Sequence, residues 1–114
     1  MKYLMIHCVD ETDLNPDEVT PPDLEEILAA WVKRWQDRGV LLDGSRLRPT
    51  SDATTVRVRG DEVLIADGPF AETREQVAGY DLIECADLDE ALEVAAEHPT
   101  ALIGTIEVRP LWAG

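Results

Sequence analysis

Residues 67–76 read Asp67-Gly68-Pro69-Phe70-Ala71-Glu72-Thr73-Arg74-Glu75-Gln76, and Gly79-Tyr80 follow shortly after. Glycine adopts a positive φ without steric cost and proline fixes φ, so Gly68-Pro69 predicts a sharp turn. The segment then leads from one strand, through a charged stretch with a helical turn at 73–77, into a second strand. Phe70 is the only phenylalanine, and we expect it to anchor this loop in the core.

This segment allows two interpretations. In the first it is only a turn, with Glu72 and Glu75 in solvent or paired with Arg74. In the second it is the rim of a pocket, because loops carry binding and catalytic residues more often than cores do. In that case Asp67 is a candidate for proton transfer and Glu72 for substrate binding.

The flanking sequence predicts alternating strands and helices. Apolar residues at helical spacing predict a helix over 22–38, capped by Thr20 and ended by Gly39. Asp87 predicts the cap of a second helix with a buried stripe of Leu88, Ala91, Leu92 and Ala95, stopped by Pro99. Apolar and β-branched runs predict strands at 1–9, 40–47, 79–85 and 102–108, and a hairpin of 54–59 with 63–66 around Gly60-Asp61.

The predicted order is β-α-β, a hairpin, and β-α-β within a single domain, 1–114. Without the hairpin it is βαββαβ, the ferredoxin-like arrangement of the α+β class. The two helices cover one face of the sheet, with Trp31 and Trp35 in the core. The other face, which we call the open face, is left without a cover. A second copy would cover it and form a dimeric α/β barrel, so we expect a homodimer through this face.

Composition excludes several classes of function. The net charge is −14, from 24 acidic and 10 basic residues, which argues against direct nucleic-acid contact and against an anionic membrane surface. Cys8 and Cys85 lie in apolar runs and are predicted to be reduced core residues. We find no leader-like segment, no nucleotide-binding motif and no metal-ligand spacing, so we predict a cytoplasmic protein without a metal or other cofactor.

Histidines and one tyrosine are the next candidates. His7 shares its parity along the first strand with Tyr3 and Met5, and we expect it to point toward the cavity-forming face as a general base or acid. The alternative is a core histidine bonded to a neighbouring strand. His98 is explained by the dipole at the end of the second helix. Tyr80 either presents its hydroxyl to a pocket or packs with it satisfied.

Charged residues near strand ends are candidates for binding an anion. Arg57 alternates with Val56 and Val58, so it lies either on an exposed hairpin face or in a cleft between subunits, where it would hold a carboxylate. Glu107 and Arg109 share one face at the end of the last strand. They form either a surface ion pair or a cleft-lining pair.

Several motifs together resemble the DGPF branch of the YCII-related proteins: Met1-Lys2-Tyr3, Ala53-Thr54-Thr55-Val56-Arg57, the 67–76 segment, Leu88-Asp89-Glu90-Ala91-Leu92 and Ile106-Glu107-Val108-Arg109-Pro110. Arg74 stands where lysine is commoner. The resemblance implies a ferredoxin-like protomer and a dimeric α/β barrel. Distant members use a His–Asp pair whose histidine lies on the first helix. Ile27 stands at that place here, so that pair is not carried over.

The resemblance implies two functions. Relatives with this barrel include lactone isomerases and dehydrochlorinases, which suggests isomerase- or lyase-like proton transfer on a small organic acid. In this interpretation His7 or Asp67 moves the proton, and the substrate is held by residues among Arg57, Glu72, Tyr80, Glu107 and Arg109. The alternative is a non-catalytic regulatory protein linked to a sigma factor, because genes of this branch often neighbour sigma-factor genes.

Overall fold

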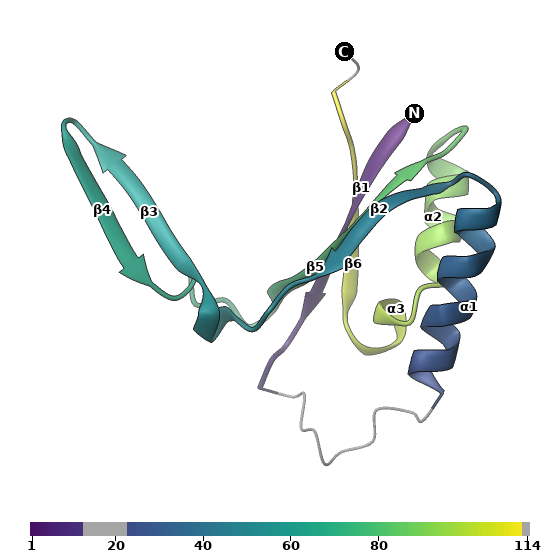
Figure 1. Ribbon diagram of the computed structural model, residues 1–114, viewed down its shortest axis with the longest axis horizontal. Helices are drawn as coiled ribbons and strands as arrows, with labels where there is room; N and C mark the ends of the chain where they lie inside the picture. The colour runs from purple at the N-terminus through teal and green to yellow at the C-terminus, as the bar shows by residue number, and fades with distance from the viewer. Residues whose placement is uncertain (13–22, 113–114) are drawn as a thin grey trace.

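The computed structural model describes residues 1–12 and 23–112. Four strands form one antiparallel sheet in the order β2-β5-β1-β6 (Figure 1). They are β1 (Lys2–Val9), β2 (Leu41–Arg46), β5 (Gln76–Glu84) and β6 (Thr105–Pro110). With helices α1 (Leu24–Asp37) and α2 (Leu88–Ala96) in the crossovers, this is the predicted ferredoxin-like βαββαβ arrangement. The predicted cap Thr20 lies outside the described residues.

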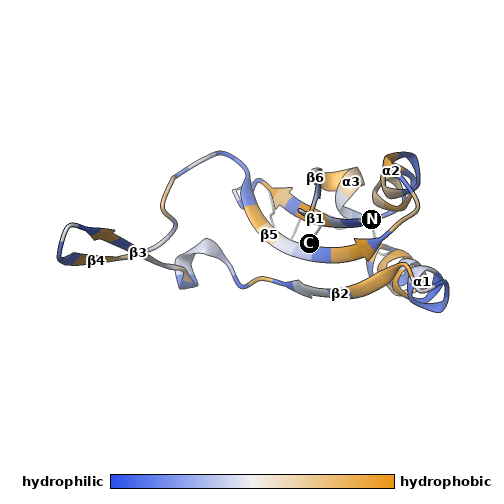
Figure 2. Ribbon diagram, turned by 90° about the horizontal axis from the view of Figure 1, so that it is seen from above, coloured by the Kyte–Doolittle hydropathy of each residue, from blue (hydrophilic) through white to orange (hydrophobic). Residues whose placement is uncertain are grey.

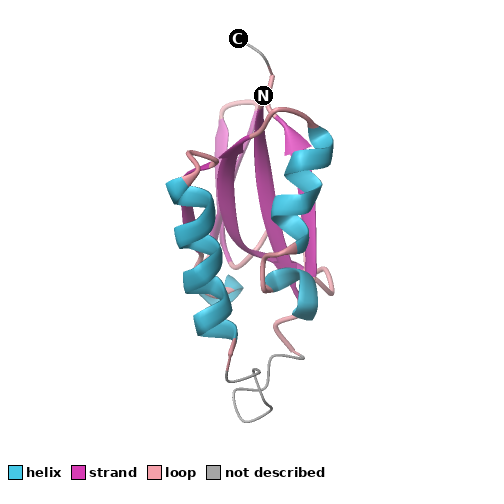
Figure 3. Cartoon of the chain, turned by 90° about the vertical axis from the view of Figure 1, so that its right-hand side faces the viewer, coloured by secondary structure: helices cyan, strands magenta, loops and turns pink. Residues whose placement is uncertain are grey.

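Both long helices lie on one side of the sheet (Figure 3). Alternate residues of β1 and β5 point toward them and form the core with Trp31 and Trp35 of α1 and with Ala91 and Val94 of α2. Trp31 also donates from Nε1 to the carbonyl of Val94, at 2.9 Å, which ties the two helices together. Helix α2 begins as predicted, since the Asp87 carboxylate accepts from the Glu90 backbone N–H. Among the described residues, no helix is long and apolar enough to span a membrane.

The open face of the sheet is formed by the residues that alternate with the core residues along β1 and β5. By strand register, Leu4 and Ile6 of β1 lie beside Leu82 and Tyr80 of β5 on this face, and all four are half-buried. Neither long helix covers it (Figure 3). The predicted division of the sheet into a helix-covered face and an open face is therefore confirmed within the described chain.

The predicted hairpin is confirmed and stands away from this body. Strands β3 (Thr54–Arg59) and β4 (Glu62–Asp67) pair with each other as a separate two-stranded sheet, and they extend to the side opposite the helices (Figures 1 and 2). Gly60 at the hairpin turn and Gly68 at its base both have positive φ, 59° and 92°. The Gly68 N–H donates to the carbonyl of Ala53 at 2.7 Å and closes the base.

Several local predictions are wrong. Phe70 is 79% exposed and does not anchor the loop in the core. No helical turn forms at 73–77, because β5 already begins at Gln76. Leu88 and Leu92 are about half exposed, and Val94 takes their place in the buried stripe. The last strand begins at Thr105 rather than 102, because Thr100–Ile103 form the short helix α3. A further short element, the 3₁₀ helix η1 (Thr50–Asp52), precedes β3.

The core predicts the effect of one truncation. Ile83 of β5 is fully buried, so Ile83→Ala should lower the free energy of unfolding by about 2–5 kcal/mol through lost burial and a residual cavity. Leu102→Ala on α3, where the side chain is 69% exposed, is the matched control and should change it by less than ~0.5 kcal/mol. Urea unfolding at one protein concentration measures both, and equal losses would contradict this account of the core.

Candidate functional site

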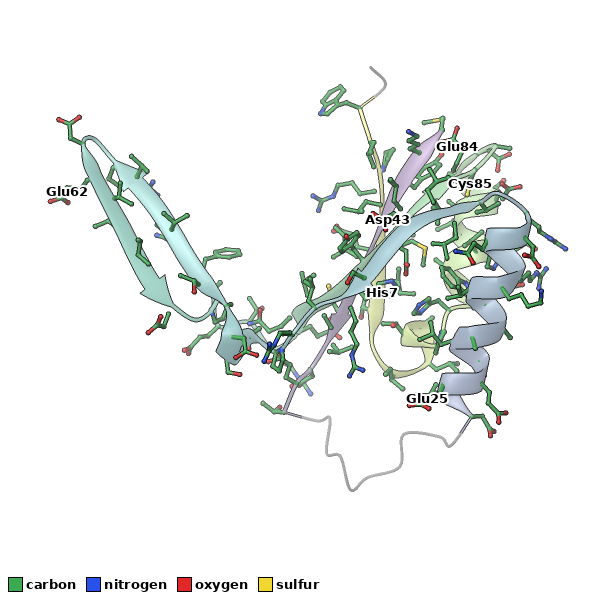
Figure 4. All side chains as sticks on the ribbon, viewed as in Figure 1. His7, Glu25, Asp43, Glu62, Glu84 and Cys85 are labelled. Atoms are coloured by element: carbon green, nitrogen blue, oxygen red, sulfur yellow. The ribbon has the colours of Figure 1, made fainter. Side chains whose placement is uncertain are left out.

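Three ionisable side chains meet between the sheet and the end of α2. His7 of β1 and Asp81 of β5 join through Nε2 and Oδ2 at 2.6 Å, and the His98 Nε2 lies 3.7 Å from the same oxygen. The two imidazole rings have centroids 4.2 Å apart. His7 and His98 are only 5% and 7% exposed. We call these three residues the His–Asp–His cluster; Figure 4 shows His7 on the sheet near its helix-covered side.

Two glycines make room for the His7–Asp81 bond. His7 pairs with Gly79 and Asp81 pairs with Met5, so the two side chains are diagonal neighbours on one face. Gly79 offers no side chain opposite His7, and a bulge follows at once in the register. On the other side of Asp81 lies Gly44 of β2, where a Cβ would come 2.0 Å from the Asp81 Oδ1.

His98 is held in one orientation. Its Nδ1 accepts a hydrogen bond from the Thr100 backbone N–H at 3.0 Å, and Trp31 packs edge-on against its ring with centroids 4.6 Å apart. An accepting Nδ1 carries no proton, so the neutral ring bears its proton on Nε2, which faces Asp81. Burial, and after it the charge of His7, lowers the pKa of His98 to about 4. His98 is therefore neutral at pH 7.

His7 has the opposite arrangement. Its Nε2 is bonded to the carboxylate of Asp81, whereas its buried Nδ1 has no hydrogen-bond partner among the described residues. A carboxylate next to one ring nitrogen favours a proton there and leaves the lone pair of the other nitrogen free. The Nδ1 lone pair of His7 is thus left without a donor among the described residues.

The cluster suits proton transfer better than metal binding. One ligand atom from each residue lies within 4.8 Å of the others, which is close enough for a shared ion. However, a metal on the His98 Nε2 would need that nitrogen's lone pair, and the ring proton would move to Nδ1. There it would face the Thr100 N–H that now donates to Nδ1, so two donors would oppose each other.

The structure separates the sequence-predicted site residues. His7 lies on the helix-covered face, so the expectation that it points toward the cavity-forming open face is wrong; the parity it shares with Tyr3 and Met5 is that of the core. Tyr80, Glu107 and Arg109 lie on the open face by register, and Arg109 donates to Glu107 at 2.6 Å. The structure does not bring them to His7.

Asp67, Arg57 and Glu72 lie in or beside the hairpin, which extends away from the cluster (Figure 4). Arg57 lines a shallow depression of about 260 Å³ there, together with Thr55, Leu64, Ile65, Ala66, Pro69 and Phe70. Arg57 and Phe70 would offer a guanidinium and an aromatic face to a ligand in this depression.

Sequence reasoning missed Asp81 and misread His98. A carboxylate between Tyr80 and Leu82, with the parity of the buried Ile83, is a signal of a paired buried acid. His98 is predicted to interact with the dipole at the end of α2, but it lies beyond the C-cap Glu97 and its ring is buried. Nothing in the local sequence shows that it reaches the first strand.

The topology and the cluster together define a ferredoxin-like α+β domain with a half-buried carboxylate between two imidazoles. The model of the YCII-related domain matches residues 1–113, and the chain belongs to this family. An uncharacterized protein of Rhizobium meliloti is 45% identical over 86 residues, covering 74% of this chain and 69% of its own.

One solved structure aligns over the whole chain and over 96% of its own length, with a TM-score of 0.49 and 12% identity. It is a 5-chloro-2-hydroxyhydroquinone dehydrochlorinase of Burkholderia phenoliruptrix in complex with 2,5-dihydroxybenzoquinone. At this level of similarity no residue's role carries over to this chain.

The space opposite Asp81 gives a direct prediction. Gly44→Ala should force the Asp81 carboxylate to move and break its bond to His7, because the added Cβ would overlap Oδ1. We expect a stability loss of about 1–3 kcal/mol and shifted ring resonances of His7 in the NMR spectrum. Ser45→Ala, one residue along the same strand, is the control. Unchanged His7 resonances in the Gly44 variant would contradict the prediction.

The lowered pKa of His98 predicts a pH dependence of stability. Between the unfolded value of about 6.5 and the folded value of about 4, the unfolded chain binds a proton that the folded chain does not. Stability is therefore unaffected by this group above about pH 6.5 and falls as the pH falls toward 4, by up to ~1.4 kcal/mol per pH unit. Urea midpoints from pH 4.5 to 7.5 should show a shallower dependence in His98→Gln. Parallel curves would show that His98 does not contribute.

Proposed function

We propose that this YCII-related protein is an acid/base enzyme that moves a proton on a small organic acid, with isomerase- or lyase-like chemistry. The observation that carries the proposal is the His7 imidazole, which has the Asp81 carboxylate on one nitrogen and a buried, unpartnered nitrogen on the other among the described residues. This is the arrangement that an oriented general base requires.

The chemistry follows from the proton positions. Nδ1 of His7 takes a proton from a substrate carbon next to an acidifying group, and the C–H electron pair stays on the substrate as an enolate. Asp81 stabilises the imidazolium that forms. The proton returns at another carbon in an isomerisation, or the electron pair expels a leaving group in an elimination. Because His7 is 5% exposed, the proposed step requires the surrounding side chains to move and admit a small molecule to Nδ1.

His98 adds a neutral donor to the site. Its pKa, lowered to about 4 by burial and by His7, keeps it uncharged at pH 7. Its Nε2–H, 3.7 Å from the Asp81 Oδ2, can then support the carboxylate without competing with His7 for a proton. The two imidazoles have separate roles in this proposal, because the Nδ1 of His98 accepts from Thr100 whereas the Nδ1 of His7 has no partner among the described residues.

The remaining candidates keep their proposed roles only within a dimer. We propose a homodimer through the open face, where Leu4, Ile6, Tyr80 and Leu82 lack a cover in the described chain. Closure by a second copy would shelter Tyr80 with Glu107 and Arg109, and would bring a partner to the hairpin residues Arg57, Asp67 and Glu72. These residues are proposed for substrate binding, and Asp67 for a second proton-transfer role.

Proton exchange in D₂O tests the proposed chemistry. The purified protein is incubated with a 2-oxo acid, an unsaturated lactone and a β-chlorinated carboxylic acid, and loss of the carbon-bound proton signal is followed by NMR. His7→Gln and Asp81→Asn should lower the exchange rate of an accepted probe by about 10²–10⁴-fold. Asp37→Asn, which changes an exposed carboxylate paired with Lys33 on α1, should leave it unchanged.

Two results would overturn the proposal. Exchange that persists in the folded His7→Gln variant would remove the base. A folded wild-type protein that exchanges none of the probes, and whose His7 resonances none of them shifts, would favour the non-catalytic regulatory alternative.

A further inference from the structure

The β3–β4 hairpin carries an apolar face with no cover. Residues directly opposite in an antiparallel pair share a face, and here Val56 lies opposite Ile65 and Val58 opposite Val63. These four side chains are 58–69% exposed. The charged residues Arg57, Arg59 and Glu62 have the other parity. We call the four-residue surface the hairpin apolar face.

Such a hairpin needs something to pack against. Two strands alone are marginally stable in water, because they have no hydrophobic layer to bury. Here all six residue pairs from Thr54–Asp67 to Arg59–Glu62 are in register, yet within the described chain β3 and β4 form a sheet with each other only. Figures 1 and 2 show the hairpin away from the helices and from the four-stranded sheet.

The size of the exposed surface points to a protein partner. At the exposures above, the hairpin apolar face presents on the order of 400 Å² of apolar surface, as large as the largest patch on a typical monomer. That is roughly half of the ~800 Å² that each partner buries in a standard interface. The open face lies on the same side of the molecule and can provide the remaining area of such an interface.

We propose that the hairpin is an arm that lies on a second copy of this chain, with the hairpin apolar face buried against it. The proposal rests on the homodimer proposed above and adds the arm to its interface. A second copy is favoured because one two-fold axis covers both the open face and the arm of each chain reciprocally. The four side chains of the hairpin apolar face carry no charge in a chain of net charge −14, and Asp67, which shares their parity, lies at the base of the hairpin. The face therefore selects an apolar surface rather than a basic partner.

The arm is tested on the full chain by two measurements. Hydrogen exchange of residues 54–67 is compared at protein concentrations below and above the dimer dissociation constant found by sedimentation. If the arm packs on the second copy, the backbone amides of residues 54–67 should exchange at least tenfold more slowly in the dimer than in the monomer. Val56→Thr with Ile65→Thr keeps β-branched residues on the hairpin but removes apolar surface, and should raise the dissociation constant at least tenfold. Arg59→Thr with Glu62→Thr, a directly opposed pair on the other face of the hairpin, should change it less than threefold.

The outcomes separate the arm from the rest of the proposal. A dimer whose 54–67 amides exchange at the same rate as in the monomer, with equal dissociation constants for the two double variants, overturns the arm and leaves the homodimer standing. Amides that are protected equally in the monomer place the arm on its own chain and also overturn it. A monomer at every concentration overturns both. The proton-exchange assay with His7→Gln reports on the chemistry independently of all three.

Discussion

Alternation along β1 places every other side chain of the first strand beneath the helices. Tyr3, Met5, His7 and Val9 are buried there, whereas the residues between them face away. A shift of one residue in register would exchange the two sets and put His7 on the open face. The core and the His–Asp–His cluster therefore depend on the same alternation, because the core residues Met5 and Ile83 fix the register that brings His7 beside Asp81.

The cluster shows how a core can hold a carboxylate. Asp81 is paired with His7 at 2.6 Å, and a second imidazole lies within 3.7 Å of the same oxygen. An unpaired buried charge is strongly unfavourable, and a paired one is tolerated when its lone pairs are satisfied. Among the described residues, the Nδ1 of His7 and the Nε1 of Trp35 are buried nitrogens without a hydrogen-bond partner, whereas most buried polar atoms have one. In the proposed function, this nitrogen of His7 is the feature that would distinguish a reactive centre from a structural ion pair.

Much of the fold was predictable because its signals are local. The Asp87 cap, the hairpin turn at Gly60 and the positive φ at Gly68 each follow from the residue at that position. The site was less predictable, because His7, Asp81 and His98 are distant in sequence and meet only through sheet register and the packing of α2. The prediction that Phe70 is buried was wrong for a related reason. An aromatic residue in a loop indicates burial, but this loop lies at the base of the hairpin, where the described chain provides no core to bury it.

Two apolar surfaces, the open face and the hairpin apolar face, have no cover within the part of the chain that the structure describes. The open face could in principle be covered by its own hairpin, but the hairpin stands away from the sheet on that side (Figure 1). The Gly68–Ala53 bond and the Thr55 hydroxyl bond to the Gly68 carbonyl hold β3 and β4 together where they leave the body. The hairpin apolar face and the open face therefore do not cover each other within the described chain. In the proposed homodimer, a second copy related by a two-fold axis would cover both surfaces of each chain.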